Sequence, residues 1–159
     1  MYKKRLLSNT NYERNNIMQE NINVLDELNK GSDMGLVAID YILDKIGNKD
    51  FKKGLKSQYL EYKKVCKEVE KLYSKLSDKK PHKINDIEKI MSYYGIEMRT
   101  ITDKSDSKYA ELLLKGTNMG IIEGRKLLNN KDVDKKINKL LDEFVSMQEK
   151  YVEFLKKYL

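Results

Sequence analysis

The sequence has very little of several residue types on which common protein chemistries depend. Among its 159 residues there are one cysteine, one histidine, one proline and no tryptophan. Cys66 has no second cysteine with which to form an internal disulfide, and a small buried hydrophobic residue is its simplest interpretation. His82 lies beside the proline in a polar linker, residues 77–82, where a solvated side chain is expected. The sequence therefore predicts neither a cysteine–histidine nucleophile nor an enzyme.

Long apolar runs are also missing. No stretch approaches the roughly 18 consecutive apolar residues that a membrane-spanning helix needs. The basic residues near the N-terminus are not followed by the apolar region of a secretory signal. We therefore expect a cytoplasmic protein with no membrane partner.

Arginine is scarce although the chain is basic. The formal net charge is +7, but only four of the 32 basic residues are arginine. Base recognition and two-point phosphate binding favour arginine over lysine. Many lysines lie opposite an apolar helix stripe, where a solvated surface is expected: Lys53, Lys56, Lys63, Lys64, Lys67 and Lys71. Nucleic-acid binding is therefore the least favoured function class.

What the sequence does contain is an internal repeat. Residues 30–35 read Lys-Gly-Ser-Asp-Met-Gly, and residues 115–120 read Lys-Gly-Thr-Asn-Met-Gly. We call these the first and second hexapeptides. Each is followed by an apolar stretch and then by Asn-Lys-Asp, at residues 48–50 and 130–132. The repeat predicts that one helical hairpin has been duplicated.

From the Asn-Lys-Asp loops onward, the two halves match at an offset of 82 residues. The first half places Phe51, Leu55, Gln58, Tyr62, Val65, Val69, Leu72 and Leu76 four and three residues apart, and the second half places Val133, Ile137, Leu140, Phe144, Met147, Tyr151, Phe154 and Tyr158 in the same way. This spacing is typical of a helix that buries one face. Further apolar residues widen each stripe, which suits a helix packed against two neighbours in a bundle.

These patterns predict an all-α protein, a four-helix bundle of two duplicated hairpins joined by a crossover helix. We expect helices over residues 17–46, 50–77, 107–128 and 133–158, a connecting helix over 85–102, and Asn48 or Asp50 as the cap of the second helix. Residues 1–17 would form a polar tail. Residues 18–159 would form a single domain, divided into a hairpin (18–77), a connection (78–104) and a second hairpin (105–159).

The hexapeptides are expected to form a helix-packing motif. Its residues are Gly31, Ser32, Met34, Gly35, Gly116, Thr117, Met119, Gly120 and Gly124. Glycine inside a helix costs about 1 kcal/mol relative to alanine. Glycines four residues apart share one ridge, where they would let another helix backbone approach closely. A kink at the glycines is the alternative. We expect the two copies to lie near each other in the middle of the bundle.

With its duplicated hairpins, its connecting segment and the second hexapeptide, the chain resembles the ferritin-like superfamily over residues 20–159. It is most similar to small bacterial members of unknown function, which often carry Gly-Glu-Asp where this chain has Gly-Thr-Asn. The resemblance implies a di-iron or di-manganese site built from glutamates and Glu-x-x-His motifs. Here Glu61 is followed three residues later by Lys64, and Glu143 by Ser146. The ligand pattern is therefore missing, and no cofactor is expected.

Two arrangements could replace such a site. Ser32, Gln58 and Thr117 could form an uncharged hydrogen-bonded layer that sets the helix register. Alternatively, a carboxylate-only metal site could use Asp33, Asp40, Glu111 and Glu123. Asp26, Asp33 and Asp40 recur every seven residues, and we expect them to be a solvated edge that faces lysines.

The leading functional hypothesis is a structural or protein-interaction module, with a homo-oligomer or a protein partner. The alternative is a metal-binding or redox protein with an atypical carboxylate site.

Overall fold

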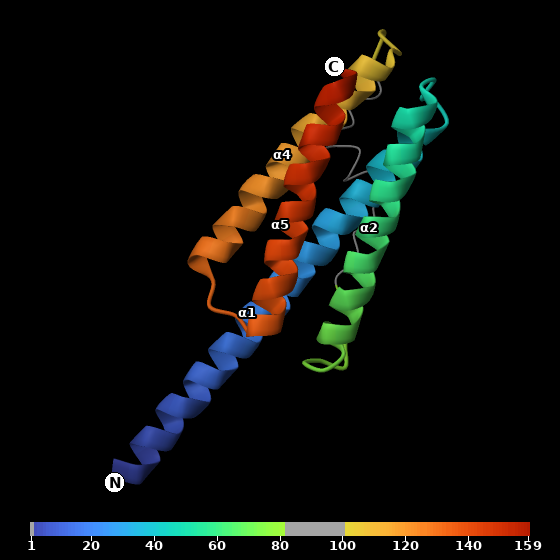
Figure 1. Ribbon diagram of the computed structural model, residues 1–159. Coiled ribbons are helices and arrows are strands. Elements are labelled where there is room, and N and C mark those ends of the chain that lie inside the picture. Colours follow the sequence, from blue (N-terminus) through green and yellow to red (C-terminus); the bar gives the residue numbers. More distant parts are fainter. Residues whose placement is uncertain (1, 82–100) are drawn as a thin grey trace.

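The computed structural model describes residues 2–81 and 101–159 of the chain (Figure 1). Every regular element in these residues is helical: α1 (Tyr2–Leu43), α2 (Lys49–Tyr73), α4 (Asp106–Asn130) and α5 (Lys135–Leu155), followed by the short 3-10 helix η1 (Lys156–Tyr158). The predicted all-α class with four helices is confirmed for the described part. His82 and residues 85–100 of the predicted connecting helix lie outside it.

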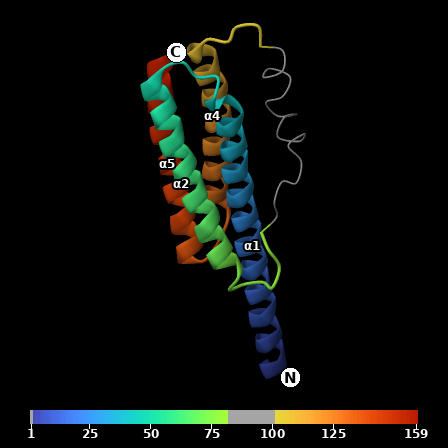
Figure 2. The same cartoon turned by 90° about the vertical axis from the view of Figure 1, so that its right-hand side faces the viewer.

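The helices pack as two antiparallel hairpins, α1 with α2 and α4 with α5 (Figures 1 and 2). α1 and α5 run in one direction along the bundle, and α2 and α4 run in the other. The core between them is apolar, and its largest fully buried side chains are Phe51, Leu25, Leu28, Ile39, Ile42, Leu55, Leu112, Leu141, Leu155, Val24, Val69 and Val145. No helix among the described residues has both the length and the apolar character needed to cross a membrane.

The first helix is much longer than expected. α1 begins at Tyr2 and not near residue 17, and its first part projects beyond the other helices (Figure 2). The side chains of residues 12–19 are exposed, and that of Tyr12 is 77% exposed. Neither glycine nor proline occurs before Gly31, so no residue in this stretch interrupts the helix. At their other ends, α1 and α2 stop about one turn earlier than predicted.

The starts of α2 and α4 are held by side-chain caps. Asn48 Oδ1 accepts hydrogen bonds from the backbone N–H groups of Asp50 and Phe51, each at 2.9 Å. Ser105 Oγ accepts one from the backbone N–H of Lys108 at 3.2 Å. These bonds satisfy N–H groups that have no partner within the first turn of a helix. Asn48 is therefore the cap of the second helix, one of the two residues predicted.

Each hairpin loop is hydrogen-bonded to the first helix of the other hairpin. The Asp106 carboxylate accepts hydrogen bonds from the backbone N–H groups of Gly47 at 2.9 Å and Asn48 at 2.7 Å. At the opposite end of the bundle, Asn21 Oδ1 accepts a hydrogen bond from the backbone N–H of Asp134 at 2.9 Å. Positions 21 and 106 are 85 residues apart, the same separation as the two hexapeptides. Residues at equivalent positions of the two halves therefore connect the hairpins at both ends of the bundle.

Candidate functional site

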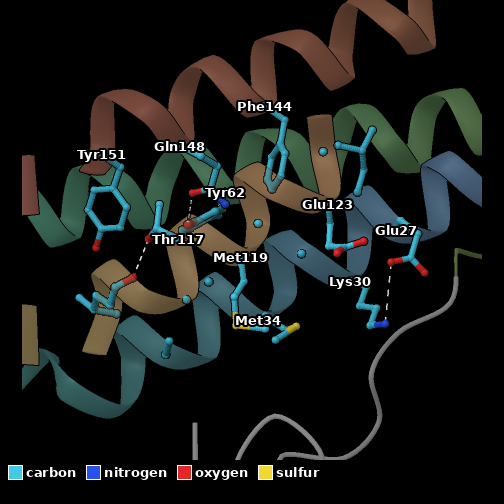
Figure 3. Close-up of a pocket in the computed structure, with 18 of the residues that line it drawn as sticks. Glu27, Lys30, Met34, Tyr62, Thr117, Met119, Glu123, Phe144, Gln148 and Tyr151 are labelled. Carbon is cyan, nitrogen blue, oxygen red and sulfur yellow. Dashed lines mark hydrogen bonds and ion pairs between the residues drawn. The ribbon is translucent and has the colours of Figure 1, made fainter. Parts of the chain in front are cut away.

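The two hexapeptides lie within helices α1 and α4, and they line the same cavity between the hairpins. The cavity has a volume of about 140 Å³, and residues of α2 and α5 complete its wall. Met34 and Met119, which occupy the same place in the two hexapeptides, lie beside each other at its edge (Figure 3). The repeated sequence is therefore placed where all four helices contribute to one site.

The glycines make room for side chains of the neighbouring helices. A Cβ atom on Gly35 would lie 2.4 Å from the Tyr62 ring, and one on Gly124 would lie 2.4 Å from Val145 Cγ2. A Cβ on Gly31 would lie 3.3 Å from Phe144 Cζ. Another helix backbone was expected to approach closely at these glycines. Large side chains of α2 and α5 occupy the space instead. The alternative of a break is not observed either, since α1 and α4 continue through the glycines.

A buried hydrogen bond crosses the cavity wall from one hairpin to the other. The Tyr62 hydroxyl on α2 donates to Gln148 Oε1 on α5 at 2.7 Å, and both side chains are buried (Figure 3). Gln148 Nε2 lies 2.8 Å from the position that a Cβ on Gly120 would take. Within the described part of the chain this amide nitrogen has no hydrogen-bond partner. Because Tyr62 occupies the amide oxygen, the N–H donors of Gln148 are directed toward Gly120 on the far wall.

The polar groups inside the cavity carry no charge. Besides Tyr62 and Gln148, Thr117 is buried, and its hydroxyl donates to the Leu113 carbonyl of its own helix at 2.7 Å. Charged side chains lie at the rim, where Lys30 Nζ is 3.8 Å from Glu27 Oε2 and both side chains are about half exposed. Glu123 is also at the rim, and its Oε1 pairs with Lys126 Nζ at 2.8 Å. The site therefore combines a neutral interior with a rim of mixed charge.

The carboxylates that were candidates for a metal site do not come together. Asp33 and Asp40 contact side chains of α2, whereas Glu123 pairs with Lys126. Glu111 pairs with two lysines of its own helix, Lys108 at 2.8 Å and Lys115 at 3.0 Å, and hydrogen bonds from both lower the pKa of its carboxyl. In the part of the chain that the structure describes, no three Asp, Glu, Cys or His side chains are grouped so as to hold a metal ion.

The glutamates at the matched positions of the two halves also lie away from the cavity. Glu61 pairs with Lys64 at 2.6 Å, and Glu143 pairs with Lys139 at 3.6 Å. All four side chains are substantially exposed. Exposed ion pairs of this kind contribute little to stability.

The row of aspartates on α1 contacts side chains of α2. Its members contact hydroxyl and thiol groups in antiparallel order: Asp40 with Tyr59, Asp33 with Cys66, and Asp26 with Tyr73. Tyr59 donates to Asp40 Oδ2 at 3.2 Å, and the Cys66 thiol lies 3.8 Å from Asp33 Oδ1. Burial, with the Asp33 charge next in size, raises the pKa of the Cys66 thiol to about 12. Cys66 is therefore a protonated, poorly reactive thiol.

The predicted polar layer is replaced by a different pair. Ser32, Gln58 and Thr117 are all buried, but Thr117 bonds within its own helix, and Gln58 Nε2 has no hydrogen-bond partner among the described residues. The interhelical bond is the one between Tyr62 and Gln148, and sequence analysis did not single out Gln148. The available signal was its position four residues after Phe144, on the face that α5 buries.

A comparison of the chain with protein-family models, with curated proteins and with solved structures finds no match in any of the three.

Proposed function

We propose that this protein is a non-enzymatic interaction module, and that it binds a small molecule in the cavity between its hairpins. The observation that carries the proposal is the volume of about 140 Å³ at the meeting point of the two hexapeptides. Protein interiors are close-packed and contain few voids larger than a water molecule. An apolar cavity of roughly 150 Å³ is large enough to bind benzene. Glycines of both hexapeptides line this cavity although glycine lowers helix stability, which favours a binding role over a packing defect.

We also propose that the bundle is ferritin-like and that its two hairpins are duplicated. Two observations support this. First, α2 ends and α4 begins at opposite ends of the bundle, which are the points that a ferritin-like crossover connects. Second, the two hexapeptides are 85 residues apart, and the loop-binding residues Asn21 and Asp106 have the same separation.

Ligand binding by the full chain tests the small-molecule proposal. Small neutral aromatic compounds such as toluene should raise the melting temperature of the protein, because a ligand that binds only the folded state stabilises it by mass action. Gly120→Leu, which places a large side chain against Gln148, should abolish the shift. Ile122→Ala is a matched control, since Ile122 is exposed on the same helix and does not line the cavity. A shift of equal size in the wild type and in Gly120→Leu would contradict the proposal.

A second candidate function is contact with a protein partner or with another copy of the chain. The projecting part of α1 favours it, because this part exposes Tyr12, Ile17 and Met18 to solvent. Sedimentation of the full chain and of a variant without residues 1–18 would test it. If the projection mediates self-association, only the full chain should form oligomers.

A further inference from the structure

We propose that the cavity selects a small, uncharged molecule with a compact apolar body and one hydrogen-bond-accepting group, such as a ketone. This inference rests on the proposed function, because it assumes that the cavity is a binding site. It assigns the recognition of the acceptor to the side-chain amide of Gln148.

The first step concerns the donor. Gln148 is only 3% exposed, and its Oε1 already accepts the 2.7 Å hydrogen bond from the Tyr62 hydroxyl. This bond holds the amide with Nε2 toward Gly120, where the missing Cβ leaves the N–H groups open to the cavity. No described residue accepts a hydrogen bond from Nε2. Because a ligand that covers this donor without accepting a hydrogen bond from it would leave the N–H groups unpaired, a ligand acceptor at this point would be bound in preference to an apolar atom.

The second step concerns the body of the ligand. Apolar side chains from three helices form much of the wall around the donor: Met34, Ile39, Leu113, Leu141 and Phe144. Methionine side chains adapt their shape and make favourable contacts with aromatic rings. A body of about the size of one aromatic ring matches both this lining and the volume of about 140 Å³.

The third step concerns charge. The polar side chains inside the cavity, Tyr62, Thr117, Gln148 and Tyr151, are neutral, and the charged residues lie at its rim. Moving an ionised carboxylate or ammonium group into such an interior is strongly unfavourable without a partner of opposite charge. The ligand is therefore neutral at the end that enters the cavity.

Three compounds of similar shape test these steps on the full chain. Acetophenone has a ring and a carbonyl acceptor, α-methylstyrene replaces the carbonyl oxygen with a CH₂ group, and benzoate carries a charge. Dissociation constants measured by titration calorimetry should show that acetophenone binds about tenfold more tightly than α-methylstyrene, the effect expected of one buried hydrogen bond. Benzoate should bind more weakly than both.

Two glutamine variants connect this preference to the proposed donor. Gln148→Met keeps a similar shape without the N–H groups, so it should bind acetophenone and α-methylstyrene equally. Gln58→Met is the matched control, because Gln58 is a buried glutamine of α2 outside the cavity, and it should keep the wild-type preference. If Gln148→Met does not fold, Tyr62→Phe removes the bond that orients the amide and should reduce the preference.

The outcomes separate the two proposals. Equal binding of acetophenone and α-methylstyrene by the wild type would overturn the acceptor inference and leave the cavity as a binding site. A preference that persists in Gln148→Met would show that another group recognises the acceptor. Tight binding of benzoate would overturn the neutral class. Binding of none of the three compounds, nor of toluene, would overturn the proposed function itself.

Discussion

Gly31 and Gly35 lie one turn apart in α1 and allow a matched test of the packing at the cavity. Replacing either with alanine should improve helix propensity by about 1 kcal/mol. The two sites differ in what the new methyl group would meet. At Gly31 it would lie 3.3 Å from Phe144 Cζ, whereas at Gly35 it would lie 2.4 Å from two atoms of the Tyr62 ring.

The expected cost at Gly35 follows from these distances. Carbon atoms in favourable contact are roughly 3.5–4.0 Å apart, so the Tyr62 ring would have to move by about 1 Å. The ring is 3% exposed, and its hydroxyl is bound to Gln148. Overpacking costs about 1–3 kcal/mol and loss of the hydrogen bond about 0.5–1.5 kcal/mol. When the gain in helix propensity is subtracted, Gly35→Ala should destabilise the fold by about 1–3 kcal/mol. Gly31→Ala should leave the stability unchanged or increase it by up to about 1 kcal/mol.

Urea unfolding of both variants and the wild type measures this difference. The slope of the unfolding free energy against urea concentration should be the same in all three proteins. In thermal unfolding, each kcal/mol corresponds to about 2–4 °C for a chain of this size. Gly35→Ala should therefore melt clearly below Gly31→Ala. If Gly35→Ala is as stable as Gly31→Ala or more stable, Tyr62 does not fill the space beside Gly35, and the described cavity wall is incorrect.

Other parts of the structure give three further predictions. Removal of residues 1–16 should change the melting temperature by no more than about 2 °C, because the described side chains of this stretch are exposed; a larger loss would mean that the projection packs on the bundle. Asp106→Ala should lower the unfolding free energy by about 1–2 kcal/mol, since it removes two charge-assisted hydrogen bonds to a loop, whereas an unchanged urea midpoint would show that the loop is not held there. The folded-state pKa of Cys66 is raised from 9.0 to about 12, so its contribution to stability is fully present below pH 9.0 and is lost as the pH rises toward about 12. The urea midpoint should therefore decrease more between about pH 8 and about pH 10 in the wild type than in Cys66→Ala. An equal decrease in both proteins would contradict the raised pKa.

Much of the fold could be predicted from the sequence because its signals are local. The four-and-three spacing of Phe51, Leu55, Gln58 and Tyr62 is a property of one helix, and all four side chains are buried. The cap at Asn48 depends only on neighbouring residues. The length of α1 was harder to predict, because a polar stretch is typical of a tail, although polar residues without glycine or proline can continue a helix.

The site was harder to predict because it depends on how the helices are rotated and aligned. The spacing favoured Met147 for the interior of α5, but its neighbour Gln148 is the buried residue of the two. A rotation of one residue position changes which side chain enters the cavity, and such a rotation is set by packing. The contact of Asp33 with Cys66 likewise depends on the register between α1 and α2, which neither stripe specifies alone. The glycines indicated close packing, but their sequence does not say whether a backbone or a side chain fills the space.

The most direct test of the central claim is a crystal structure of the full chain under xenon pressure, because xenon enters apolar protein cavities of this size. We expect a xenon atom between α1 and α4, where Gly31, Gly35, Gly116 and Gly120 line the cavity, and none at this place in crystals of Gly120→Leu. A wild-type crystal in which side chains close this space and no xenon binds would contradict the cavity and the function proposed for it.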